Sequence, residues 1–120
     1  MNKRETGAGR EALAAEYLAA HGMHISERNF HCRQGEIDII GYHNGYLVFV
    51  EVKYRGTENF GGALEAVDLR KQRRICRTAD HYRYLHRLGD DCSVRYDVVA
   101  FQGTEISWIQ NAFPHIYSRR

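Results

Sequence analysis

The Asn44-Gly45 dipeptide lies between two strand-like runs, and this arrangement constrains the fold more than any other feature of the chain. Both residues accept the positive φ that a two-residue hairpin turn requires. Residues 35–55 therefore predict an antiparallel hairpin with a defined register. The predicted pairs are His43–Tyr46, Ile40–Phe49, Ile39–Val50, Asp38–Glu51 and Glu36–Lys53.

Two acidic residues, Asp38 and Glu51, interrupt the apolar pattern of this hairpin. The register places them opposite each other at a non-hydrogen-bonded position, with Cβ atoms about 4.5–5.5 Å apart. Side chains alternate between the faces of a strand, so we expect one polar and one apolar face. The polar face would hold Glu36, Asp38, Ile40, Phe49, Glu51 and Lys53, and the core face Ile37, Ile39, Val48, Val50 and Val52.

Directly opposed carboxylates destabilise a hairpin unless something compensates their charge. A divalent cation would do so, because hard cations take oxygen ligands from carboxylates, water and phosphates. Lys53 follows Glu51 by two residues, and its ammonium could orient an attacking water or stabilise charge developing on phosphorus. This set of residue types points to phosphodiester cleavage. An exposed hairpin face with Glu36 and Lys53 as an ordinary ion pair is the alternative.

The remaining elements can be placed by periodicity and end signals. Residues 9–21 predict a helix with the stripe Leu13, Tyr17 and Ala20, ending at Gly22. Asp68 is expected to cap a second helix that runs to about Leu88, with Gly89 as its stop and Ile75, Ala79 and Tyr82 as its stripe. Residues 24–32, 94–101 and 105–109 predict strands, and residues 56–63 a Gly-rich loop. The order α-β-β-β-α-β-β predicts an α/β fold with a mixed sheet, in which a helical crossover follows the antiparallel hairpin.

Length and composition narrow the class of protein. The 120 residues fit one domain, and the net charge of +2 is too small to indicate nucleic-acid binding by itself. Three cysteines without a C-x-x-C spacing favour free thiols in a reducing compartment. The sequence shows neither a signal peptide nor an apolar run that could span a bilayer, so we expect a cytoplasmic protein without a membrane partner.

The motifs resemble a known family. "GREALAAEYLAAHG", "GEIDII", "LVFVEVKYR" and "RYDVVAF" occur in the order and at the spacing of the bacterial YraN-like family of predicted endonucleases. That family belongs to the PD-(D/E)xK nuclease superfamily and is similar to archaeal Holliday junction resolvases. The resemblance covers nearly the whole chain. It implies a restriction-endonuclease-like mixed sheet with flanking helices.

The resemblance also implies roles for individual residues. Asp38 and Glu51 match the metal-binding acids, and Lys53 matches the catalytic lysine. The Val52 carbonyl would also reach the ion, which is expected to be Mg²⁺ or Mn²⁺. Glu11 matches a helix glutamate that completes the metal site in related resolvases; an ordinary helix-surface acid is the alternative. Glu36 would position Lys53 or form its ion pair.

The expected activity is a structure-selective DNA endonuclease, acting on branched or otherwise non-B-form DNA. Nucleic-acid contacts are expected from Tyr54, Arg55, Arg70, Lys71 and Arg74. A structure-specific nuclease of this size often works as a symmetric homodimer, because one active site cuts one strand. The alternatives are a non-catalytic adaptor that binds branched DNA, and a nuclease acting on RNA or on single-stranded ends.

Overall fold

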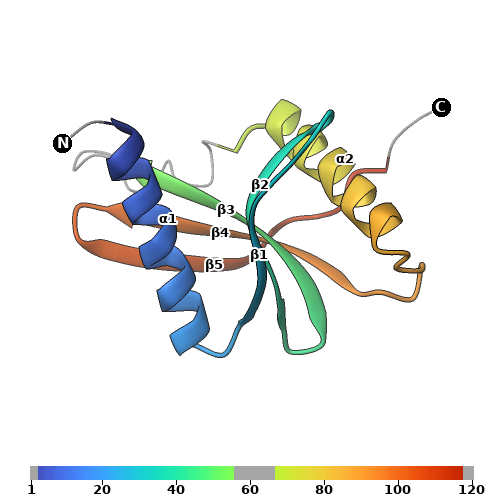
Figure 1. The fold of residues 1–120 in the computed structure, drawn as a ribbon, viewed down its shortest axis with the longest axis horizontal. Coiled ribbons are helices and arrows are strands. Elements are labelled where there is room, and N and C mark those ends of the chain that lie inside the picture. The colour runs from blue at the N-terminus through green and yellow to red at the C-terminus, as the bar shows by residue number, and fades with distance from the viewer. Residues whose placement is uncertain (1–2, 56–66, 118–120) are drawn as a thin grey trace.

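The computed structural model describes residues 3–55 and 67–117, with side chains for 9–54 and 67–117. The elements follow the order expected from the sequence, α-β-β-β-α-β-β (Figure 1). They are α1 (Lys3–Ala20), β1 (His24–Cys32), β2 (Gly35–His43), β3 (Tyr46–Arg55), α2 (Leu69–Leu85), β4 (Val94–Gln102) and β5 (Glu105–Phe113). The predicted fold class is therefore confirmed.

One five-stranded sheet runs in the order β1-β2-β3-β4-β5. Its pairs are antiparallel except β3–β4, which is parallel because α2 carries the chain back across the sheet. The predicted hairpin register is confirmed from His43–Tyr46 to Ile39–Val50. Asn44 and Gly45 form the turn with φ of 51° and 84°.

The two helices cover opposite faces of the sheet. Ala14 and Leu18 of α1 pack with Val50, whereas Ile75 of α2 packs with Phe49, the neighbouring residue on β3. Alternate residues of β3 therefore belong to two separate core clusters, one on each face of the sheet. The strand is covered on both sides, which explains its nearly continuous apolar sequence.

β2 leaves β3 beyond the Ile39–Val50 pair and continues with β1 as a two-stranded arm. Figure 1 shows the turn end of this arm beside α2. The expected pairing of Glu36 with Lys53 is therefore wrong, and Glu36 pairs with His31 of β1 instead. The expected core face is also wrong at Ile37, which packs on the α2 side while Ile39 packs on the α1 side. Strict alternation fails because the strand departs from its partner at this point.

The buried stripe of α1 differs from the predicted one. Ala14, Ala15 and Leu18 are buried, whereas Leu13 is about half exposed at 51%. The helix stop at Gly22 is confirmed, with φ of 101° and a hydrogen bond from the Met23 N–H to the Leu18 carbonyl. Two alanines on the stripe bring the helix axis close to the sheet.

The second helix follows its prediction at the start and departs from it at the end. The Asp68 carboxylate accepts the N–H of Lys71 at 2.9 Å, and Ile75, Ala79 and Tyr82 are buried as expected. The helix ends at Leu85 rather than Leu88. Arg87, not Gly89, adopts the left-handed conformation at its end, with φ of 55°.

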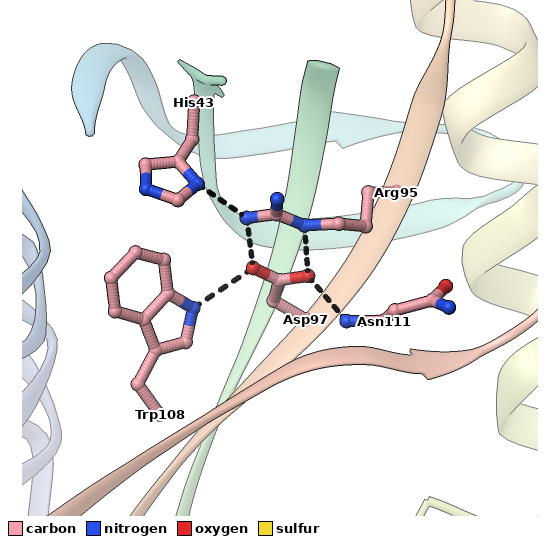
Figure 2. A network of polar contacts seen from close by, with 5 residues as sticks. All are labelled: His43, Arg95, Asp97, Trp108 and Asn111. Carbon is pink, nitrogen blue, oxygen red and sulfur yellow. Dashed lines mark hydrogen bonds and ion pairs between the residues drawn. The ribbon is translucent and has the colours of Figure 1, made fainter. Parts of the chain in front are cut away.

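A buried polar network ties the sheet together on the α1 side (Figure 2). Arg95 and Asp97 form a two-bond ion pair at 2.9 and 2.8 Å, and both are at most 6% exposed. The Asp97 carboxylate also accepts the indole N–H of Trp108 and the backbone N–H of Asn111. Asn111 lies at an irregularity of β5, so the carboxylate satisfies a donor that the ladder omits. Asp97 therefore has a structural role in the sheet.

Candidate active site

Asp38 lies where β2 separates from β3, and its carboxylate replaces a backbone hydrogen bond that is lost there. Its Oδ2 accepts the backbone N–H of Val52 at 2.8 Å. In a continued hairpin that N–H would bond to a backbone carbonyl of β2. The side-chain bond therefore holds the two strands together after their ladder ends, and it fixes the carboxylate next to Glu51.

Glu51 carries the most perturbed carboxyl group at the site. Its side chain is only 11% exposed. Burial, followed by the charge of Asp38 and a direct carboxyl–carboxyl contact with it, raises the pKa of Glu51 to about 7. The expectation that Asp38 and Glu51 lie together is thus met by the geometry, although the strand ladder no longer pairs them.

Two lysines share the Glu51 carboxylate. Lys53 Nζ lies 4.0 Å and Lys71 Nζ 3.5 Å from Glu51 Oε1. Burial and the adjacent Lys71 ammonium lower the pKa of Lys53. Burial acts to lower the pKa of Lys71 too, but its contacts with Lys53 and Glu51 raise it overall. Lys53 is therefore the lysine that gives up its proton more readily.

Glu11 projects from the buried stripe of α1 toward the same centre. It shares the helical spacing of Ala14, Ala15 and Leu18, and its side chain is 15% exposed. Burial and the nearby Asp38 charge raise the pKa of Glu11, against Arg28 at 3.9 Å, which lowers it. Its Oε1 has no hydrogen-bond partner among the described residues. The spacing of this acid along the apolar stripe is the signal that separates it from an ordinary surface glutamate.

Pockets open on both sides of the acid pair. One of about 350 Å³, between the β1–β2 arm and α2, is lined by His31, Cys32, Gly35, Glu36, Glu51, Lys71, Arg74 and Ile75. The other, of about 250 Å³ on the α1 side, is lined by Arg10, Glu11, Asp38, Val52 and Tyr54. Because Asp38 contacts both Glu51 and the Val52 N–H, the two acids form the wall between the pockets.

The other residues expected at the site divide between these pockets and the surface. Tyr54 is half exposed and stacks under the Arg10 guanidinium, 3.4 Å from its ring centre. Glu36 is 70% exposed and lies 3.4 Å from His31, away from Lys53. Arg70 is exposed on α2 and lines neither pocket. Arg55 ends β3, but its side chain and the loop at 56–63 lie outside the described residues.

Sequence reasoning missed two features of this centre. Lys71 was expected only as a nucleic-acid contact, yet it forms an ion pair with Glu51. Arg10 and Arg28 were not singled out, although they flank Tyr54 and Glu11. The position of Lys71 three residues after the Asp68 cap fixes it in the first helical turn, but no local pattern shows that this turn faces β3.

Fold and site together define the class: an α/β protein with a five-stranded mixed sheet, bearing an acid–acid–lysine centre where two strands part. A family model described as "Uncharacterised protein family UPF0102" matches residues 10–101, and the chain belongs to this family. It is similar to a UPF0102 protein of Lachnoclostridium phytofermentans, with 49% identity over 94% of this chain and 96% of the relative. A UPF0102 protein of Methylococcus capsulatus shares 47% identity over 89% of each chain, and one of Legionella pneumophila 40% over 92% and 95%.

These comparisons confirm the YraN-like family expected from the sequence. No helix within the described ranges is long and apolar enough to cross a membrane.

Proposed function

We propose that this protein is a divalent-metal-dependent endonuclease that hydrolyses phosphodiester bonds of structured DNA. The observation that carries the proposal is the contact between the Asp38 and Glu51 carboxyls, with two lysine ammonium groups beside Glu51. Carboxyl groups in contact raise the cost of each other's ionisation, so a centre of this kind is unfavourable for stability alone. Lys71 and Arg74 line the pocket on the α2 side and Arg10 the pocket on the α1 side, and these cations suit a polyanionic substrate.

The residues present fit a hard divalent cation. Within residues 9–54 and 67–117, no three His, Cys, Asp or Glu side chains are arranged to hold a metal ion. Mg²⁺ needs fewer protein ligands than that, because it keeps several waters and binds through one or two carboxylates plus substrate phosphate. Asp38 and Glu51 would hold it, with the Val52 carbonyl. Glu11 Oε1, which has no hydrogen-bond partner among the described residues, is a further oxygen nearby. When bound, the ion would supply Lewis-acid stabilisation of charge on the phosphate oxygens.

The chain's own residues supply the remaining chemistry. The Lys53 ammonium is held beside Glu51 in a partly buried position, where it can donate to a phosphate oxygen and orient the attacking water. The Lys53 side chain is only 21% exposed, so its ammonium is partly shielded from water. Its electrostatic interaction with a phosphate oxygen is therefore stronger than in bulk water. Asp38 keeps the geometry by accepting the Val52 N–H, which fixes β2 against β3 at the reacting centre.

The testing experiment is cleavage of labelled duplex, flap and four-way-junction DNA, and of matching RNA, with Mg²⁺, Mn²⁺ or EDTA. Wild type is compared with Lys53→Ala and with Arg73→Ala, a variant at an exposed basic residue that lines neither pocket. Metal-dependent cutting that only Lys53→Ala abolishes supports the proposal. The relative cleavage rates then show whether branched DNA is preferred to linear DNA, and DNA to RNA. Binding of branched DNA without cutting would instead favour a non-catalytic adaptor. Cutting that survives Lys53→Ala would contradict the assigned centre.

A second readout tests the metal without activity. Thermal unfolding of wild type should shift upward with millimolar Mg²⁺ or Mn²⁺, because a ligand that binds only the folded state stabilises it. Asp38→Asn and Glu51→Gln should lose this shift. A shift that both variants keep would place any bound metal elsewhere.

A further inference from the structure

The pocket between the β1–β2 arm and α2 has a composition that the proposed chemistry does not account for. Two carboxylates and two cations line it, and the steps proposed for hydrolysis give no role to Glu36, Lys71 or Arg74. The pocket is open and shares the Glu51 side chain with the catalytic centre. A group bound there would therefore lie next to the reacting phosphate.

Lys71 enters this pocket from the first turn of α2. Its ammonium lies 3.5 Å from Glu51 Oε1, and the Lys71 side chain is 33% exposed, so it is partly desolvated but still reachable. An ammonium carries three N–H donors, and one contact with Glu51 leaves others for a second anion. The same residue thus touches the catalytic carboxylate and faces the pocket.

Arg74 lies one helical turn further along α2 and lines the same pocket. The stem of Arg74 crosses closely over Gly35, since a Cβ added at Gly35 would lie 3.0 Å from Arg74 Cγ. This packing directs the side chain along the pocket wall. No ion-pair or hydrogen-bond partner of its guanidinium occurs within the described part of the chain. An arginine fork without a partner suits the two oxygens of a phosphate.

The acidic members of the pocket do not cancel these cations. Glu36 is 70% exposed and lies against His31 at 3.4 Å, on the arm side. Glu51 is already matched by Lys53 and Lys71. The other arginines of α2, Arg70, Arg73, Arg77 and Arg83, do not line the pocket. The geometry thus separates two of the helix's cations from the rest.

We propose that Lys71 and Arg74 form a phosphate-binding subsite that holds the backbone phosphate next to the scissile one. The subsite rests on the proposed nuclease function for its substrate, a nucleic-acid strand. It would position the strand by its backbone, without reading bases. Lys71 would link the two places, because it contacts the carboxylate of the catalytic centre and the neighbouring phosphate at once.

The test is binding of fluorescein-labelled DNA in EDTA, measured by anisotropy from 50 to 300 mM salt. The pocket variant Lys71→Gln/Arg74→Gln is compared with Arg73→Gln/Arg77→Gln, which removes the same charge from the same helix. The pocket variant should weaken binding about tenfold or more and lower the salt slope by about 1–2. The matched variant should change affinity by less than about threefold. Lys71→Arg should restore most of the affinity, and melting temperatures exclude misfolding as the cause.

The outcomes separate this inference from the proposed activity. Equal losses in both double variants would overturn the subsite, since affinity would then come from the general charge of α2. Cleavage by wild type with no selective loss in the pocket variant would overturn the subsite while the nuclease stands. A selective binding loss in a protein that never cleaves would support the subsite while the catalytic proposal fails. An absence of DNA binding by wild type would overturn both.

Discussion

The Asp38 carboxylate accepts the backbone N–H of Val52 at 2.8 Å, at the point where β2 and β3 stop pairing. One side chain thereby replaces a ladder bond and places a carboxyl against Glu51. The local architecture and the candidate chemistry consequently depend on the same oxygen atoms. Variants at Asp38 can separate the two roles.

Asp38→Asn keeps an oxygen that can accept the Val52 N–H but removes the charge. We expect stability within about 1 kcal/mol of wild type and a loss of metal-dependent cleavage of at least about a hundredfold. Asp38→Ala should lose the hydrogen bond as well and destabilise by about 1–3 kcal/mol. Urea unfolding beside a cleavage assay measures both. Equal stability of the two variants would show that the bond to Val52 contributes nothing.

Glu51 should make the metal-free protein less stable as pH rises. Its pKa is about 7 in the folded protein against an ordinary value of 4.5, so between these pH values the folded state retains a proton that the unfolded state has lost. Stability from this group is therefore present below pH 4.5 and is lost as pH rises to about 7. Glu51→Gln should remove that dependence and exceed wild type by on the order of 1–3 kcal/mol at pH 8. Urea unfolding in EDTA across pH 5 to 8.5 measures it, and parallel curves for the two proteins would refute the assignment.

Asp97 should be among the most sensitive positions outside the site. Asp97→Ala leaves the Arg95 guanidinium buried without its partner and leaves the donors of Trp108 and Asn111 unpaired. We expect a loss of about 3–5 kcal/mol in unfolding free energy. The double change Arg95→Met/Asp97→Leu should be less harmful than Asp97→Ala, because it removes the charge pair together. A double variant as unstable as the single one would mean that the hydrogen bonds of Asp97 to β5 outweigh its ion pair.

Gly35→Ala should push the arm away from α2. An added Cβ would lie 2.9 Å from the Thr78 hydroxyl, and the φ of 152° is strained for any residue with a side chain. We expect a loss of about 1–3 kcal/mol. Adding Thr78→Ala should recover the steric part but not the backbone part. Chemical unfolding of the two single variants and the double variant gives the coupling free energy between positions 35 and 78. Strictly additive effects on the unfolding free energy would argue against the steric contact.

Local chemistry predicted most of the fold. The Asn44-Gly45 turn set the hairpin register, and the Asp68 cap set the start of α2, because both depend on residues close in sequence. Predictions failed where a tertiary contact overrides a local period. Ile37 changed face because β2 leaves β3, and Leu13 proved exposed because small residues, not large ones, allow α1 to approach the sheet.

The candidate centre was only partly accessible to the same reasoning. Asp38, Glu51 and Lys53 lie on one hairpin, so a register was sufficient to bring them together. Lys71 comes from a helix beyond the crossover, and only packing of α2 on the sheet shows that it touches Glu51. Glu36 was misplaced for the converse reason, because the arm carries it away from Lys53.

The centre draws its groups from four separate elements, α1, β2, β3 and α2, which are held in place by the pairing of β3 with β4. During synthesis these segments emerge from the ribosome one after another, and β4 follows all of them. A growing chain that ends before β4 has every one of these acidic and basic residues but not the parallel strand that fixes their support. The centre is therefore completed only after β4 has been synthesised.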